Sequence, residues 1–304
     1  MDRVKKLIHL ERAYKMGYNG KNISVAVMDT GIVNHPDFDQ RIMLFKDFTR
    51  GRIGAYDDNG HGTHVSGIIA GNGRMSERSK GVRPYAGIAP GAKILMLKVL
   101  DYAGNGNTSS VLAGIDWIIK NKEKYCIRIL NISVGMLLTA GEKEKRELLS
   151  AVDAVWDAGI LVVTAAGNNG PKENTVTIPG ISRKVITVGS MDDMAGTERH
   201  SPLVKGYSGA GPTECCIVKP EILAPGTNIK SCSKDGRGYV VKSGTSMAAP
   251  VVAGVLALAF EQNGELTPAE MKLRLYESAY PRGKQLQKKC WGMIHADNLL
   301  RYEK

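Results

Sequence analysis

Two histidines stand three residues apart in the segment DNGHGTHVSGIIAG, residues 58–71, of a chain with only six histidines. His61 and His64 could form a metal-binding pair, a catalytic base with a bystander, or two core residues. A zinc site needs a third ligand, and the H-E-x-x-H pattern also needs a glutamate, whereas Gly62 and Thr63 fill the gap here. The spacing therefore disfavours a metal pair. His64, one helical turn after His61, is expected to be packed and hydrogen-bonded.

Two further reactive side chains occur where strands end and helices begin. Asp29 closes the apolar run NISVAVMD, and Ser246 opens the long apolar segment that starts at SGTSMAAP. A carboxylate, an imidazole and a hydroxyl are the parts of a nucleophilic relay, in which imidazole takes the serine proton and the carboxylate orients the imidazole. These residue types also occur in this order in many unrelated proteins, so they do not establish the chemistry alone.

The elements that must position these side chains alternate along the chain. Continuously apolar runs predict buried parallel strands at 22–29, 92–101, 128–135, 159–168 and 184–190. Helices are predicted at 61–71, 107–122, 142–159, 246–262 and 268–278. This order predicts an α/β fold: a doubly wound, mostly parallel central sheet with helices on both faces, in a single domain over 1–304. Chemistry in such sheets collects at the carboxyl ends of the strands.

Composition excludes several other functions. The chain has 304 residues, is 43% hydrophobic and 23% charged, and has 41 basic and 30 acidic residues for a net charge of +11. The basic residues are scattered among carboxylates without interleaved aromatic residues, so nucleic-acid binding is not expected. The longest apolar stretches are too short or too interrupted by Gly and Pro to span a bilayer, so no membrane partner is expected. Composition makes no prediction of oligomeric state.

The cysteines and the start of the chain bear on its compartment. Five cysteines, with Cys215 and Cys216 adjacent, do not suit a disulfide framework. No apolar signal core follows Met1, so a cytoplasmic location is expected, or a secreted one if this is a processed form. Only 28 residues precede Asp29, and no folded propeptide is evident.

Four longer motifs carry a family resemblance. VAVMDTGI, HGTHVSGIIAG, TAAGNNG and GTSMAAPVVAG, in this order, closely resemble the subtilisin-like serine peptidases, the subtilase family, over about Gly20 to Ala279. The resemblance implies the family's three-layer fold, protein or peptide substrates, and a serine endopeptidase that needs no cofactor for catalysis. It implies that Asp29, His61 and Ser246 are its triad and that an acyl-enzyme intermediate forms.

The resemblance also implies an oxyanion hole and substrate-binding segments. Asn168, in TAAGNNG, matches the asparagine whose side-chain amide donates to the oxyanion beside the Ser246 amide; taken alone, Asn168-Asn169-Gly170 would be only a turn. The segments expected to pair with an extended peptide are Gly104, Asn105 and Gly106, and Ser133, Val134 and Gly135. Thr177 stands where glycine is common in the specificity pocket, and is expected to favour medium apolar side chains over aromatic ones.

One departure from the secreted subtilisins concerns a metal site. Asp37 matches a calcium ligand of the family, so the resemblance makes a structural calcium ion at Asp37 possible. The stretch 72–87 replaces the loop that normally supplies the partner ligands, so a strong calcium site is not expected. The alternative to an active peptidase is a catalytically silent protein that binds peptides or partner proteins on the same scaffold.

Overall fold

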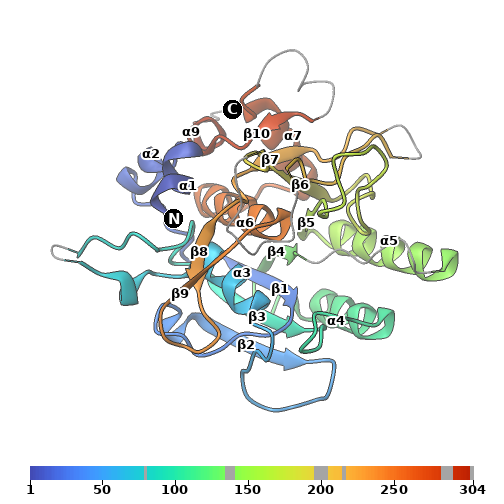
Figure 1. Cartoon of the computed structure of the whole chain (residues 1–304), viewed down its shortest axis with the longest axis horizontal. Coiled ribbons are helices and arrows are strands. Elements are labelled where there is room, and N and C mark those ends of the chain that lie inside the picture. Colours follow the sequence, from blue (N-terminus) through green and yellow to red (C-terminus); the bar gives the residue numbers. More distant parts are fainter. Residues whose placement is uncertain (79–80, 134–140, 195–204, 214–216, 282–289, 302–304) are drawn as a thin grey trace.

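A computed structural model of the chain describes residues 1–78, 81–133, 141–194, 205–213, 217–281 and 290–301. Its centre is an eight-stranded sheet with the strand order β10-β7-β6-β5-β4-β1-β3-β2 (Figure 1), and every neighbouring pair is parallel. The strands are β1 (Ser24–Asp29), β2 (Ile42–Asp47), β3 (Lys93–Lys98), β4 (Ile127–Ile132), β5 (Leu161–Ala165), β6 (Ile186–Ser190), β7 (Ile222–Ala224) and β10 (Gly292–Met293). The predicted parallel α/β sheet is confirmed.

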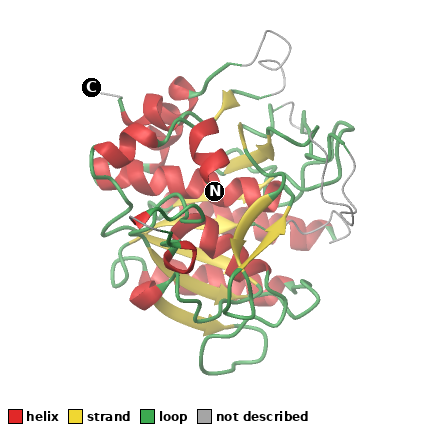
Figure 2. Cartoon of the chain, turned by 60° about the vertical axis from the view of Figure 1, so that its left-hand side comes forward, coloured by secondary structure: helices red, strands yellow, loops and turns green. Residues whose placement is uncertain are grey.

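Helices cover both faces of this sheet (Figures 1 and 2). One face packs against α4 (Thr108–Asn121) and α5 (Glu142–Asp157), and the other against α3 (His61–Ala70) and α6 (Thr245–Gln262). The remaining helices are α1 (Asp2–Leu7), α2 (Glu11–Lys15), α7 (Pro268–Ser278), α9 (Ala296–Leu300) and the short 3₁₀ turns η1 (Asp39–Arg41) and η2 (Arg74–Ser76). The result is a three-layer arrangement.

The alternation of side chains along β1 explains why its sequence is apolar from Val25 to Met28. Val25 and Val27 pack on the side of α3 and α6, while Ala26 and Met28 pack on the side of α4 and α5. A central parallel strand is buried on both faces, so neither face can be polar.

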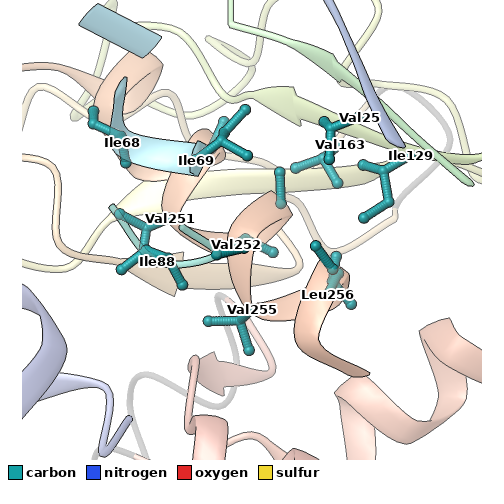
Figure 3. Close-up of a cluster of buried hydrophobic side chains, with 14 of the residues drawn as sticks. Val25, Ile68, Ile69, Ile88, Ile129, Val163, Val251, Val252, Val255 and Leu256 are labelled. Carbon is teal, nitrogen blue, oxygen red and sulfur yellow. The ribbon is translucent and has the colours of Figure 1, made fainter. Parts of the chain in front are cut away.

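The larger of the two cores lies between the sheet and helices α3 and α6. Figure 3 shows Ile69 of α3 and Val252 and Leu256 of α6 in one buried cluster with Val163 of β5. Helix α6 is apolar on all sides, as a helix buried all round must be. Among the described helices it alone has the length and composition to cross a membrane, but 83% of it is buried inside the protein, as a core helix is.

Some elements were not predicted from the sequence. An antiparallel hairpin, β8 (Ile229–Cys232) and β9 (Tyr239–Lys242), packs on α3, and the strands β2, β7 and β10 extend the sheet at its edges. These segments are short or only partly buried, so their sequences lack a long apolar run. The predicted strands and helices are all present, and their bounds differ from the predicted ones by at most three residues at either end.

Candidate active site

Asp29 and His61 are paired directly. His61 Nδ1 lies 2.8 Å from Asp29 Oδ1 and 2.9 Å from Oδ2, and the Thr30 backbone N–H donates to Asp29 Oδ1 at 2.7 Å. Asp29 is completely buried, while the His61 side chain is 20% exposed. A carboxylate on Nδ1 holds the imidazole in the tautomer that leaves Nε2 free to accept a proton.

The approach of α3 to β1 depends on Gly62. A β-carbon at this position would lie 2.2 Å from the Gly31 carbonyl oxygen and 3.0 Å from Asp29 Cβ. Any side chain at this position would therefore push the start of α3, and His61 with it, away from Asp29.

Asp57 organises the loop that leads to His61, a role not predicted from the sequence. Its carboxylate accepts hydrogen bonds from the Gly60 N–H, the Thr63 N–H and hydroxyl, and the Thr30 hydroxyl. Burial raises the pKa of Asp57, but these hydrogen bonds outweigh it and lower the pKa below its usual value. The negative charge lies at the amino end of α3, where the helix dipole favours it. The sequence feature that could have indicated this role is the position of Asp57, four residues before His61.

Ser246 is the second residue of α6 and is partly exposed. Gly244, with φ of 146°, turns the chain into the helix, and its N–H donates to the Gly226 carbonyl at 2.9 Å. Helices α3 and α6 pack against each other, and each has a predicted catalytic side chain within its first two residues. No hydrogen bond joins His61 Nε2 to Ser246 Oγ, both of which are described. Such contacts are often loose before substrate binds.

Asn168 follows β5 and lies beside the start of α6. Its side-chain oxygen accepts from the Thr245 N–H at 3.0 Å and from the Thr245 hydroxyl at 3.1 Å. Because the backbone N–H can only donate, the group facing it must be the amide oxygen, and the Asn168 NH₂ must point the other way. The Gly167 N–H also donates to the Thr245 hydroxyl, so Thr245 holds this turn at two points.

Arg3, near the start of the chain, and Asp192 are linked to the loop before Ser246. Asp192 Oδ1 accepts from the N–H groups of Gly226 and Thr227 at 2.8 and 2.9 Å, and its Oδ2 pairs with Arg3 at 2.7 Å. The Gly226 carbonyl accepts the hydrogen bond from the Gly244 N–H. The carboxylate of Asp192 therefore positions the turn from which α6 begins.

The predicted substrate-binding segments are only partly described. Leu100 and Gly106 form an antiparallel bridge, and Gly104, with φ of 83°, lies in the turn between them, where Asn105 is exposed. Asn59, two residues before His61, donates to the Tyr102 carbonyl, which places this turn near the histidine. Ser133 is buried and its hydroxyl accepts from Asn131; Val134 and Gly135 lie outside the described residues.

Thr177 packs against the strand end that carries Asn168. A β-carbon on Gly167 would lie 2.5 Å from the Thr177 methyl carbon, and Thr177 is only 4% exposed. Its N–H donates to the Ala166 carbonyl at 3.0 Å. The methyl group therefore occupies space next to the predicted oxyanion asparagine that a glycine would leave open.

His64 has the packed, hydrogen-bonded environment that was predicted for it. It is completely buried, and its Nε2 lies 3.1 Å from the carbonyl oxygens of Ile229 and Val240 in the hairpin. Burial, together with the charges of Lys242 and His61, lowers the pKa of His64 to about 3. The neutral ring therefore ties α3 to β8 and β9.

The residues around Asp37 do not fit calcium. Its carboxylate accepts from the Met75 N–H at 2.9 Å and the Tyr239 hydroxyl at 2.7 Å, and Cys232 Sγ lies 3.9 Å away. Calcium requires six to eight oxygen ligands, whereas hydrogen-bond donors and a sulfur surround this carboxylate. The donor set therefore gives no structural reason to assign a calcium ion here.

Comparison with known proteins identifies the family of the chain. Residues 20–297 match the subtilase family. Serine protease AprX of Bacillus subtilis (strain 168) is 39% identical over 291 residues, which cover 90% of this chain and 65% of that protein. Thermostable alkaline protease of Halalkalibacterium halodurans is 38% identical over 272 residues, which cover 90% of this chain and 66% of that protein. The chain thus spans about two thirds of the length of these two relatives.

Two other matches extend over most of the matched protein as well as most of this chain. Subtilisin DY of Bacillus licheniformis is 33% identical over 276 residues, covering 90% of this chain and 89% of that protein. The solved structure of a cold adapted subtilisin-like serine proteinase is 30% identical and superposes with a TM-score of 0.73, covering 92% of this chain and 90% of that one. Since the family match extends over most of the sequence, this chain belongs to the subtilase family.

Proposed function

We propose that the chain is a serine endopeptidase that cleaves protein or peptide substrates through Ser246, His61 and Asp29. The observation that carries the proposal is the buried Asp29 carboxylate within 2.8 Å of His61 Nδ1, because a carboxylate at Nδ1 leaves Nε2 free to take the serine proton. Family membership supports the same class of activity.

The reaction begins when Ser246 Oγ attacks the carbonyl carbon of the scissile bond while His61 Nε2 takes the hydroxyl proton. Asp29 stabilises the imidazolium that forms. Collapse of the tetrahedral intermediate breaks the C–N bond, and His61 returns the proton to the leaving amine. Water, activated by the same imidazole, then hydrolyses the acyl-enzyme and frees Ser246.

Asn168 and the backbone of Ser246 stabilise the negative oxygen of the intermediate. The Asn168 oxygen is held by Thr245, so its NH₂ group is oriented before substrate arrives. The N–H of Ser246 lies in the first turn of α6, where helix N–H groups have no intrahelical acceptor. Donors fixed in advance lower the barrier because no reorganisation is needed during reaction.

The alternative is a silent protein that binds peptides on the same scaffold. The observation that favours it is the missing hydrogen bond between His61 and Ser246, since a relay that never assembles cannot activate the hydroxyl. A fluorophosphonate reagent distinguishes the two, because it reacts covalently only with an activated serine.

The deciding experiment is intact-protein mass spectrometry after fluorophosphonate treatment, with peptide mapping. We expect one adduct, on Ser246. It should be lost in Ser246→Ala and retained in Ser243→Ala, which removes a hydroxyl three residues earlier in the same loop. Failure of the folded protein to label would contradict the proposal and support the silent scaffold. A cytoplasmic location and the absence of nucleic-acid or membrane partners stay predictions.

A further inference from the structure

A second cluster of reactive side chains lies beneath the β8–β9 hairpin. His35, Asp37 and Cys232 each direct one ligand atom into a common space, with all three atoms within 4.8 Å of one another. His35 Nδ1 lies 3.9 Å from Asp37 Oδ1, and Cys232 Sγ lies 3.9 Å from Asp37 Oδ2. The side chains of His35 and Asp37 are completely buried, and Cys232 is 1% exposed. The mechanism proposed above uses none of them.

The orientation of His35 is the one that a metal-binding histidine adopts. Its Nε2 lies 2.9 Å from the Gly238 carbonyl oxygen, which can only accept, so the ring proton resides on Nε2. The lone pair of Nδ1 therefore faces Asp37. It accepts the Asp37 backbone N–H at 3.1 Å, and an ion bound to Nδ1 would replace that hydrogen bond. A histidine that binds a metal through one ring nitrogen commonly donates its other ring N–H to a backbone carbonyl, which fixes the tautomer.

The protons that contact Asp37 Oδ2 are ones that an ion can replace. The Tyr239 hydroxyl donates to Asp37 Oδ2 at 2.7 Å, and the Cys232 thiol contacts the same oxygen. Asp37 Oδ1 accepts the Met75 N–H, which can remain while Oδ2 binds an ion. Arg41 lies outside the ligand set and donates to the Asp37 backbone carbonyl.

We propose that His35, Asp37 and Cys232 bind one divalent ion of the zinc class. A nitrogen, a carboxylate oxygen and a sulfur form a donor set that suits Zn²⁺ or Co²⁺ and does not suit Ca²⁺ or Mg²⁺, which require oxygen. Binding forms an M–S bond, and the Cys232 proton leaves to solvent, so one proton is released per ion. The Tyr239 hydroxyl offers an oxygen for a fourth position.

The ion would join segments that are distant in the sequence. His35 and Asp37 lie in the loop after β1, and Cys232 lies in β8, beside α3, where a β-carbon on Gly67 would meet Cys232 Sγ at 2.8 Å. Binding only to the folded chain stabilises it, because the unfolded chain does not hold the three ligands together. The site is independent of the proposed peptidase activity.

Cobalt binding tests the proposal directly. Metal-free Ser246→Ala protein, kept reduced with a phosphine, is titrated with Co²⁺, so self-digestion cannot interfere and the outcome does not depend on catalysis. We expect one equivalent to produce the near-ultraviolet charge-transfer band of a cobalt thiolate and the visible bands of a tetrahedral ion. One equivalent of Zn²⁺ should abolish both and raise the melting temperature.

Variants of the cysteines identify the ligand. The Cys232→Ser substitution should remove the charge-transfer band, whereas Cys126→Ser, which alters an exposed thiol, should retain it. If Cys232→Ser fails to fold, His35→Gln serves instead, and should weaken Co²⁺ binding at least ~10-fold while the thiolate band remains at saturation. A folded parent protein without the band, or a band that persists in Cys232→Ser, would overturn the proposal.

Discussion

Arg3 and Asp192 form an ion pair at 2.7 Å across 189 residues of sequence, and the same carboxylate accepts the N–H groups of Gly226 and Thr227. Arg3 lies in α1 and is about half exposed, while Asp192 is mostly buried. The pair therefore connects the first helix to the loop that holds Gly244, two residues before Ser246.

The Asp192 and Arg3 side chains should differ in how much each contributes to the free energy of unfolding. Asp192→Ala leaves two backbone N–H groups without an acceptor and should lower the free energy of unfolding by roughly 1–3 kcal/mol, and kcat with it. Arg3→Met removes a half-exposed ion pair and one hydrogen bond to the Thr227 carbonyl, and should cost about 1 kcal/mol, less than Asp192→Ala. Urea unfolding and steady-state kinetics measure both, with Lys6→Met on the same helix as control. Equal losses from Arg3→Met and Asp192→Ala would contradict this interpretation.

Asp57 should act on catalysis through His61. Asp57→Asn keeps the shape of the side chain, but its NH₂ group cannot accept the hydrogen bonds that Asp57 now receives. We expect a loss of about 1–3 kcal/mol of stability and a fall in kcat larger than the change in KM, because His61 shifts relative to Asp29. Asp235→Asn, at a fully exposed carboxylate, is the control. An unchanged kcat in folded Asp57→Asn would remove Asp57 from the positioning of His61.

Stability should fall in acid because of His64. Its pKa is lowered from 6.5 to about 3 by burial, so between these values the unfolded chain binds a proton at His64 that the folded chain does not. The free energy of unfolding therefore decreases as pH falls from 6.5 toward 3, by up to ~1.4 kcal/mol per pH unit from this one group. Urea unfolding of Ser246→Ala protein across this range should show the slope. His64→Gln should reduce it, and His9→Gln should not.

Thr177 should restrict the size of the side chain that precedes the cleaved bond. Thr177→Gly removes the methyl group packed beside Gly167, so kcat/KM for peptides with Phe at that position should rise by about 10-fold relative to those with Val. Thr175→Ala, two residues earlier, should leave this ratio unchanged. A ratio unaffected by Thr177→Gly would place Thr177 outside the pocket.

Calcium should not stabilise the loop around Asp37. Because hydrogen-bond donors and Cys232 surround this carboxylate, a calcium-selective chelator should leave the melting temperature of Ser246→Ala protein unchanged. Asp37→Asn should still destabilise the protein, since it removes an acceptor for the Met75 N–H or the Tyr239 hydroxyl. A drop in melting temperature on chelation, reversed by Ca²⁺, would restore the calcium site.

The sequence by itself determined the central strands of the sheet and the identity of the candidate catalytic side chains. Continuous apolar runs can be satisfied only by strands buried on both faces, and the segments around Asp29, His61, Asn168 and Ser246 are long enough to show the family. Only the tertiary structure decided which groups position these candidate catalytic side chains. Asp57 and Asp192 are ordinary loop aspartates in sequence, and His35 and Cys232 lie 197 positions apart. The roles of these residues arise because folding brings backbone N–H groups and distant side chains within bonding distance. Residue type and local spacing do not encode that proximity.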